Sequence, residues 1–306
     1  MRRQVGDFRL WVLALTPECE KELRRIRPPG VEVVPLAELE AADPEFMKSR
    51  ENRSLVEYYF SSTPCFLDYL LKKYPEVGRI TYLDADMFFF SDPSLVEREV
   101  EASSIAITPH RFRPELASHR KYGIYNVGWL SFRADTAGKE CLTEWRKQCL
   151  EWCRDEPERG RFGDQGYLDA WPEKYPGTRV VDQPGFNEAP WNVDVDKITK
   201  KNENIFIGNH PLVLFHFQSL RRISPRVFNP NWHDYGLRPS RKLIRWIYQT
   251  YLATVLKVER AAGLSPSRQE FIRRQGKLSG RNALWKFFKD VRMLTRTVTG
   301  NYLFGS

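Results

Sequence analysis

The sequence contains no hydrophobic run long enough to cross a membrane. A spanning helix needs about 18 to 20 consecutive apolar residues, and no stretch of the 306 residues approaches that length. The start of the chain does not resemble a signal peptide either, because Met1-Arg2-Arg3 leads into polar residues rather than into an apolar segment. We therefore expect a cytoplasmic protein.

Cysteine and histidine are scarce, with five residues of each. The cysteine number is odd and no pair has CxxC spacing, which favours reduced thiols over a disulfide framework. Cys149 and Cys153 lie one helical turn apart, but no histidine stands near them at ligand spacing. Buried thiols are therefore expected there rather than a zinc site.

Acidic residues are scarce in the C-terminal part of the chain. Residues 217–306 hold 18 Lys and Arg against 4 Asp and Glu, a balance of +14, whereas residues 1–216 hold 30 against 35, or −5. Such a basic segment is usually a solvated face, and peripheral contact with a membrane surface is the alternative. No recognition motif for nucleic acid accompanies the charge, so nucleic acid is not an expected partner.

Apolar runs alternate with helical patterns over most of the chain, which indicates an α/β fold with a doubly wound mixed sheet flanked by helices. The first run, residues 8–15, is typical of a strand in the middle of a parallel sheet. Two helices are expected to begin after N-cap residues. One N-cap is Thr16, which is followed by Pro17, and the other is Asp135. Strands are expected at residues 8–15, 31–34, 80–83, 104–108, 123–132, 180–182 and 212–217.

Other helical patterns follow the same reasoning. Residues 54–60 and 64–73 predict two helices, with Thr63 and Pro64 opening the second. Beyond the last expected strand, helical patterns at 240–261, 266–274 and 283–297 predict an α-helical C-terminal appendage. We divide the chain accordingly into a domain at residues 1–222 and a basic helical extension at residues 223–306.

The most informative stretch, residues 79–93, places two carboxylates at the end of a strand. Fifteen Asp in 306 residues give roughly one Asp-x-Asp by chance, and a second one occurs at Asp194 and Asp196. Only Asp84 and Asp86 follow a buried type of strand and precede another apolar run. Side chains two apart share one face of a strand, so both can meet one ligand, and oxygen ligands of like charge suit Mg²⁺ or Mn²⁺.

Polar residues recur at later points where apolar ones would be expected. Asn126 and Gly128 interrupt the strand at 123–132, and a glycine inside a strand often allows close approach of a ligand. Asp164 either caps the following helix or contacts a substrate. Trp191 and Asn192, in a loop dense in amides, form either a sugar platform or part of the core. His216, in an apolar strand, is either a core histidine or a metal ligand.

The order of these features resembles family 8 glycosyltransferases, retaining enzymes of the GT-A fold that use nucleotide sugars and manganese. The likeness spans residues 8–222 and rests most firmly on Tyr82-Leu83-Asp84-Ala85-Asp86, followed by N-x-G, D-Q, an asparagine-bearing loop and a late histidine on a strand. The resemblance implies a GT-A domain over residues 1–222. It also implies that the family's first strand and most of its first helix are absent, as in a truncated start.

The resemblance further implies roles for individual residues. Asp84, Asp86 and His216 would bind the metal ion, Mn²⁺ or Mg²⁺. The donor sugar nucleotide would lie against Asp84, Ala85, Asp86, Asn126, Gly128 and Asn192. Asp164 and Gln165 would contact the hydroxyls of the donor sugar, and Arg222 would stand where the family has a diphosphate-binding lysine, giving three catalytic candidates.

Together these features predict a metal-dependent glycosyltransferase that moves a sugar, with retention, from a nucleoside diphosphate sugar, expected to be a UDP-sugar. The acceptor is not specified and could be a saccharide, a lipid-linked molecule or a protein. An arginine that the family usually carries before the acidic strand is replaced around Phe60. The basic tail beside an incomplete nucleotide pocket gives the alternative prediction, a non-catalytic nucleotide- or sugar-binding protein, or one that binds anionic surfaces, with a degenerate transferase fold.

Overall fold

The computed structural model describes residues 8–264 and 303–304. The chain forms two compact units, Met1–Asn187 with Val213–Phe215, and Glu188–Leu212 with His216–Ser306. This division falls before residue 222, and the proposed boundary between a transferase domain and a basic extension stays a prediction. The helices expected at 266–274 and 283–297 lie outside the described residues.

The chain begins with a strand, a helix and a parallel strand. β1 (Leu10–Ala14) pairs with β2 (Val31–Pro35) across α1 (Pro17–Ile26). Thr16 caps α1 as predicted, and its hydroxyl accepts a hydrogen bond from the backbone N–H of Cys19 at 3.2 Å. Within the described part of the chain, β1 and β2 form a sheet of their own rather than the middle of a larger one. Their side chains are mostly half-buried, which agrees with this peripheral position.

Three helices follow, α2 (Leu36–Ala42), α3 (Pro44–Ser49) and α4 (Leu55–Lys73). α4 opens with a capping box between Ser54 and Glu57 and runs without a break through Pro64. The prediction of two separate helices was therefore wrong. The residues from Ser61 to Leu67 are all buried and cover every side of the helix, so tertiary packing around this part of α4 offsets the cost of an internal proline.

The central sheet of the first unit has the strand order β3-β6-β5-β7. β6 (Tyr125–Arg133) is antiparallel to β3 (Arg79–Leu83) and to β5 (Ile105–Pro109), while β7 (Thr178–Val180) is parallel to β5. The sheet is therefore mixed. This confirms the predicted class, an α/β protein with a mixed sheet flanked by helices.

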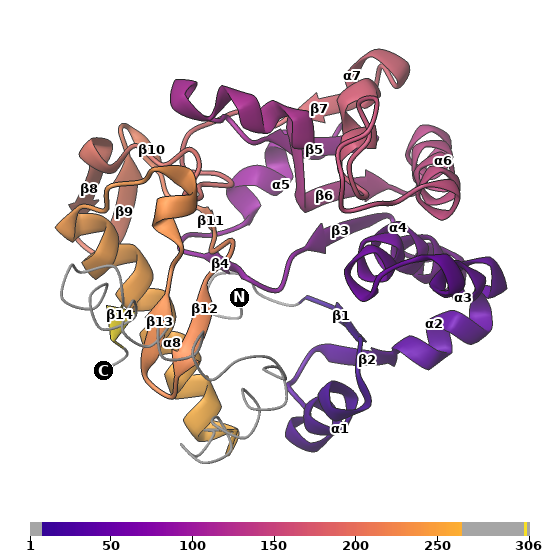
Figure 1. Ribbon diagram of the computed structural model, residues 1–306, viewed down its shortest axis with the longest axis horizontal. Coiled ribbons are helices and arrows are strands. Elements are labelled where there is room, and N and C mark those ends of the chain that lie inside the picture. The colour runs from indigo at the N-terminus through magenta and orange to yellow at the C-terminus, as the bar shows by residue number, and fades with distance from the viewer. Residues whose placement is uncertain (1–7, 265–302, 305–306) are drawn as a thin grey trace, which may run out of the picture. The chain divides into compact units, whose positions relative to one another are not determined.

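Side chains of alternating residues separate the two faces of this sheet, as strand geometry requires. Ile105, Ile107, Leu130 and Phe132 pack into the core that contains α4 and α6 (Thr136–Glu151), which lie side by side in Figure 1. Ala106 and Trp129 pack on the other face with α5 (Ser94–Val100). Each face is thus closed by helix, and the polar site described below lies where β3 and β6 leave this core.

The remaining elements of the first unit are short. β4 (Met87–Phe89) pairs with β11 (Leu214–His216), and the N–H of Phe90 donates to the carbonyl of Val213 at 2.9 Å. α7 (Trp171–Lys174) precedes β7. The 3₁₀ helices are Arg50–Asn52, Pro114–Tyr122 and Gly166–Ala170. Residues 110–121 were expected to be a loop, so the second of these was not predicted.

The second unit combines small antiparallel sheets with a helix. β8 (Ile198–Lys201), β9 (Asn204–Ile207) and β10 (His210–Pro211) form one sheet, and β12 (Arg221–Ser224), β13 (Val227–Asn229) and β14 (Leu303–Phe304) form another. 3₁₀ turns occur at Val195–Lys197 and Trp232–Tyr235. A π-helical turn at Leu243–Tyr248 leads into α8 (Gln249–Ala261), which confirms the helix expected at 240–261.

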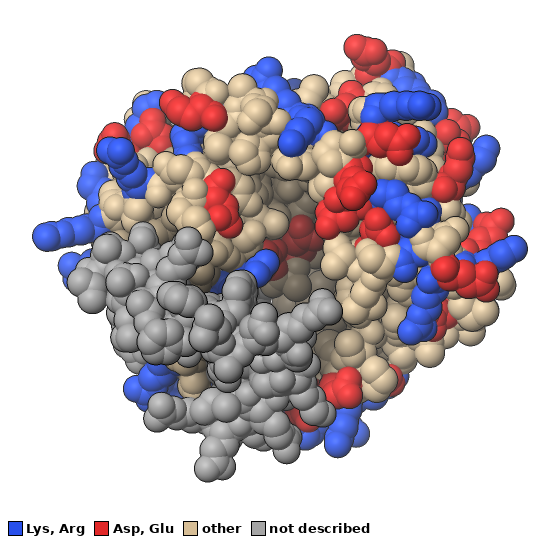
Figure 2. All heavy atoms as spheres, viewed as in Figure 1, with Lys and Arg blue, Asp and Glu red and all other residues tan. Residues whose placement is uncertain are grey.

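Charged side chains of both signs are interspersed over the helices of the first unit, as Figure 2 shows over α2, α3 and α6. Several are paired, including Arg146 with Glu45 at 2.9 Å and Arg24 with Glu20 at 2.8 Å. Within the described ranges, no helix combines the length and the apolar character that a membrane span requires.

Candidate metal centre and its amide surroundings

The turn between β3 and β4 holds both carboxylates of the Asp-x-Asp sequence. The backbone N–H of Asp84 donates to the carbonyl of Gly128 at 2.9 Å, and the N–H of Met87 donates back to the carbonyl of Asp84 at 3.2 Å. Asp84 and Asp86 are half-buried and Ala85 is exposed. The two carboxylates are therefore fixed on a short turn whose backbone is tied to β6.

Tyr82 fixes the orientation of the first carboxylate. Its hydroxyl donates to Oδ1 of Asp84 at 2.7 Å. Burial raises the pKa of Tyr82 well above its usual range, and the charge of Asp84 raises it further. The phenol therefore stays protonated and acts as a hydrogen-bond donor to Asp84.

The three predicted metal ligands come together. Asp84, Asp86 and His216 each offer one ligand atom, and these atoms lie within 4.8 Å of one another. His216 ends β11, the strand paired with β4, and only 1% of its surface is exposed. Two carboxylates and one imidazole at this separation are a donor set that could hold a divalent metal ion.

Asp164 is buried and interacts electrostatically with Asp84. Burial, followed by the negative charge of Asp84, raises the pKa of Asp164 to about 7, while hydrogen bonds from its own backbone and from Thr63 act in the opposite direction. The carbonyl of Asp164 accepts a bond from Nε1 of Trp145 at 2.7 Å. Asp164 is not the N-cap of the next helix, because that position belongs to Gln165. The capping interpretation is thus excluded.

β6 bulges away from β5 next to the acidic turn. Ile107 pairs with Leu130, but the following residue, Thr108, pairs with Asn126, so residues 127–129 have no counterpart on β5. Gly128 lies in this bulge and provides the carbonyl that accepts from Asp84. The polar residues that interrupted the strand pattern therefore mark a real irregularity of the sheet.

A network of amides fills the space that the bulge opens. Oε1 of Gln165 accepts from Nδ2 of Asn126 and from the N–H of Val127, both at 3.3 Å, and its Nε2 donates to the carbonyl of Tyr122 at 2.8 Å. Oδ1 of Asn126 accepts from the N–H of Gly128 at 3.2 Å. Gln165 and Asn126 thereby hold the backbone of β6 in place beside the acidic turn.

Asn187 belongs to this network although the sequence did not single it out. Its Nδ2 donates to Oγ1 of Thr108 at 2.8 Å and to Oδ1 of Asn126 at 3.3 Å, and the side chain is fully buried. Its backbone is left-handed, with φ 52°. The amide-rich loop at 185–192 was the available signal. Three further residues of the site were not predicted from the sequence, namely Thr63, Tyr82 and His110. Each lies in a segment whose sequence was already explained by its helix or strand pattern.

Two predicted residues have well-defined partners elsewhere in the second unit. Arg222, on β12, forms an ion pair with Glu259 of α8 at 2.5 Å and donates to the carbonyl of Pro225 at 2.5 Å. Oδ1 of Asn192 accepts from the N–H of Ala189 at 2.8 Å, which closes a local turn. Their roles toward a donor stay predictions.

Trp191 lies in the interior. It is 3% exposed and packs edge-on against His216, with ring centroids 5.3 Å apart. This agrees with a core position rather than with an exposed sugar platform.

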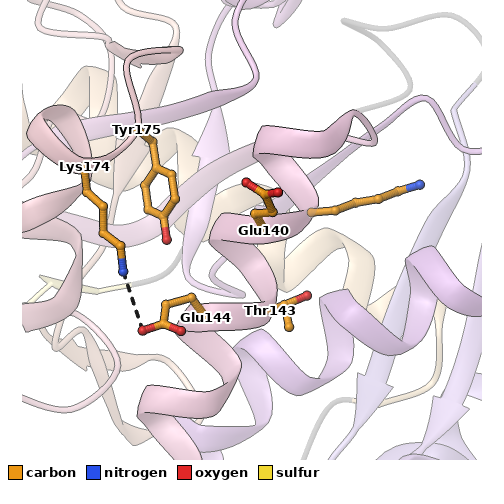
Figure 3. Close-up of a pocket in the computed structure, with 6 residues that line it drawn as sticks. Glu140, Thr143, Glu144, Lys174 and Tyr175 are labelled. Atoms are coloured by element: carbon orange, nitrogen blue, oxygen red, sulfur yellow. Dashed lines mark ion pairs between the residues drawn. The ribbon is translucent and has the colours of Figure 1, made fainter.

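Figure 3 shows an open hollow on α6 and α7. Its volume is ≈ 500 Å³, and Lys174 forms an ion pair there with Glu144 at 3.5 Å. The hollow is lined by Lys139, Glu140, Thr143, Glu144, Lys174 and Tyr175. None of the predicted site residues lines this hollow.

Comparison with known proteins gives two sequence relatives. No protein-family model matches the chain. The chain is 32% identical over 255 residues to the uncharacterized protein YfnD of Bacillus subtilis (strain 168), covering 82% of this chain and 81% of YfnD. It is 34% identical over 226 residues to the uncharacterized protein YfnF of the same organism, covering 71% of this chain and 74% of YfnF.

Among solved structures, the apo form of mouse xyloside xylosyltransferase 1 is similar with a TM-score of 0.39 and 16% identity. That match covers 59% of this chain and 73% of the mouse chain.

Proposed function

The chain belongs to the same protein family as YfnD and YfnF, and we propose that it is a metal-dependent glycosyltransferase with a GT-A type of fold. Its donor is a nucleoside diphosphate sugar, expected to be a UDP-sugar, and transfer proceeds with retention. The observation that supports this most directly is the cluster of Asp84, Asp86 and His216. The residues that the resemblance assigned to the metal are the ones that the fold brings together.

The proposed metal site includes groups that would hold its ligands in position. A divalent ion held by Asp84, Asp86 and His216 would supply Lewis-acid stabilisation of the charge that develops on the leaving diphosphate. Tyr82 keeps one oxygen of Asp84 oriented, and the Gly128 carbonyl fixes the backbone of the same residue. Positioning of this kind matters because ligand orientation strongly affects metal affinity.

Asp164 is proposed to contact a hydroxyl of the donor sugar. In the metal-free protein its pKa is raised to about 7 by burial and by the charge of Asp84, so the carboxyl can either donate or accept a hydrogen bond near neutral pH. Gln165 directs its amide toward Tyr122, Asn126 and Val127, so we assign it to shaping the sugar-binding surface. Asn126, Gly128 and Asn192 are retained as donor-binding candidates, and Arg222 as the candidate for the diphosphate.

Metal binding combined with donor turnover tests the proposal. Titration with Mn²⁺ followed by assay of UDP-sugar hydrolysis and transfer is expected to show binding and metal-dependent turnover. Asp86→Asn is expected to lower Mn²⁺ affinity by at least about tenfold, whereas Asp196→Asn, in the second Asp-x-Asp, leaves it unchanged. Metal and UDP-sugar binding without turnover would favour the non-catalytic alternative, and absence of both would refute the proposal.

A further inference from the structure

The connection between β5 and β6, residues 110–122, is attached at both ends to the proposed sugar-binding residues. At its start, Nε2 of His110 lies 3.4 Å from Nδ2 of Asn126. At its end, the carbonyl of Tyr122 accepts from Nε2 of Gln165 at 2.8 Å. Directly after it, the N–H of Ile124 donates to Oδ1 of Asp169 at 2.8 Å. The segment is therefore held against the amide network rather than extending from it loosely.

Aromatic rings follow one another along this segment. The His110 and Phe112 rings stack with centroids 4.4 Å apart and an interplanar angle of 10°. The series continues from Phe112 to His119 at 5.8 Å, from His119 to Tyr122 at 5.9 Å, and from Tyr122 to Phe162 at 4.9 Å. All of these rings except His110 are half-buried. Half-buried aromatic rings suit the apolar faces of sugar rings.

The same segment is basic in a part of the chain that is otherwise acidic. It carries four cations against the single acid Glu115, a balance of +3, whereas residues 1–216 as a whole have a balance of −5. The four cations are Arg111, Arg113, Arg120 and Lys121.

Two of the four cations, Arg111 and Arg113, are partly enclosed by the protein. Nη2 of Arg111 donates to the carbonyl of Phe186 at 2.7 Å. Arg113 is half-buried, and burial lowers its pKa.

Arg120 and Lys121 differ from these, because both are exposed. In the described ranges neither forms an ion pair with a carboxylate, and the Lys121 ammonium lies 4.9 Å from the centroid of the Tyr122 ring. This places positive charge next to aromatic surface, at the end of the segment bound to Gln165. A guanidinium and an ammonium in such a position are suited to phosphate or carboxylate groups.

We propose that residues 110–122 form the acceptor surface and that the acceptor is an anionic carbohydrate, whose sugar rings lie on the aromatic series and whose phosphate or carboxylate groups contact Arg120 and Lys121. This inference rests on the proposed transferase function and specifies its acceptor. It does not depend on the metal site for its test.

Calorimetric titration with three tetrasaccharides tests the surface. Maltotetraose is neutral, phosphorylated maltotetraose carries phosphate, and tetragalacturonate carries carboxylates. We expect the charged probes to bind at least about tenfold more tightly than maltotetraose, with an affinity that falls as salt is raised. In Arg120→Gln/Lys121→Gln this preference is expected to fall by about tenfold, since two charge-assisted contacts are lost.

The matched control is Lys21→Gln/Lys48→Gln, which removes the same charge from α1 and α3 and is expected to leave probe binding unchanged. Equal binding of neutral and charged probes would overturn the inference, as would equal weakening in the control. So would weaker UDP binding in Arg120→Gln/Lys121→Gln with unchanged probe binding, or binding of anionic vesicles alone. If the charged probes bind as expected but UDP-sugar and Mn²⁺ do not, the surface stands and the transferase assignment fails.

Discussion

The hydroxyl of Tyr82 donates to Oδ1 of Asp84 at 2.7 Å, although the two residues belong to the same strand end and are separated by one residue. The bond lets a single stretch of chain supply both a candidate metal ligand and the group that orients it. We therefore expect Tyr82 to affect metal binding without being a ligand.

Tyr82→Phe is expected to lower Mn²⁺ affinity by about tenfold, because the carboxylate loses the donor that fixes its orientation. Calorimetric titration with Mn²⁺ measures the change. Tyr69→Phe is the control, since it removes a Tyr hydrogen bond to Glu38 that lies on helices away from the site. Unchanged affinity in Tyr82→Phe would show that the bond has no role in metal binding.

The stability of the metal-free protein is expected to depend on pH through Asp164. Its pKa is raised to about 7, first by burial and then by the charge of Asp84. Its contribution to stability is therefore complete below the unfolded pKa of about 4 and declines until the pH exceeds about 7.

Asp164→Asn should accordingly be more stable than the wild type at pH 8, by on the order of a few kcal/mol, with the difference vanishing near pH 4. Urea unfolding in the presence of a chelator gives the two curves. Asp196→Asn removes an exposed carboxyl and should show no such trend. A pH-independent difference for Asp164→Asn would contradict the assigned pKa.

Gln165→Ala is expected to lower the free energy of unfolding by about 1 kcal/mol, because the Tyr122 carbonyl and the Val127 N–H lose a half-buried partner. UDP-sugar binding is expected to weaken as well, since β6 is held by the same bonds. Gln249→Ala, on the exposed start of α8, provides the comparison. Normal stability with weakened UDP-sugar binding would instead indicate direct contact between Gln165 and the donor.

Ala substitutions at Gly163 and Gly160 distinguish the effect of side-chain packing from the effect of backbone strain. Both have positive φ, 49° and 79°. A Cβ at Gly163 would lie 3.2 Å from the ring of Phe60, whereas a Cβ at Gly160 would meet nothing within 4 Å. Both Ala variants should be destabilised by strain of about 1 kcal/mol, and Gly163→Ala should lose more. Equal losses in thermal unfolding would show that Phe60 yields without cost.

Asp43 and Arg146 form a nearly buried ion pair that should contribute to stability against acid. Burial raises the pKa of Asp43, but hydrogen bonds from Arg146 and from the Phe46 N–H lower it more, so the net direction is downward. The stabilisation is therefore present above the unfolded pKa and is lost as the pH falls through the folded value.

Asp43→Asn should cost about 3 kcal/mol at pH 7, since it leaves the Arg146 guanidinium buried with less compensation. Glu20→Gln, which breaks the exposed pair with Arg24, should cost less than about 1 kcal/mol. Chemical unfolding at pH 7 and pH 3 compares the two variants. Equal losses at pH 7 would mean that burial of the pair is energetically unimportant.

Features that depend on neighbouring residues were predictable from the sequence. Thr16 and Asp135 cap α1 and α6 as expected, since a cap is set within three residues. The strand before Asp84 was also recognisable from its own apolar run. The metal cluster required in addition the resemblance that linked Asp84 and Asp86 to His216.

Features that depend on distant residues were not predictable. Arg222 pairs with Glu259, which is 37 residues away in the sequence. Neither segment has a sequence pattern that predicts this pairing. Asn187 bonds to Asn126 across 61 positions. Pro64 looked like a helix start, and only the burial of this part of α4 on all sides shows why the helix continues through it.

Gln165 makes two of its hydrogen bonds to main-chain groups, the carbonyl of Tyr122 and the N–H of Val127. Any residue at position 122, and any except proline at 127, can supply the same partner. Evolutionary constraint should therefore fall unevenly on the two sides of these contacts. Among homologous sequences we expect position 165 to remain glutamine, whereas the Tyr122 ring and the buried Val127 side chain are constrained by their own surroundings and not by Gln165. Co-variation of position 165 with positions 122 and 127 would therefore not reveal that these residues touch.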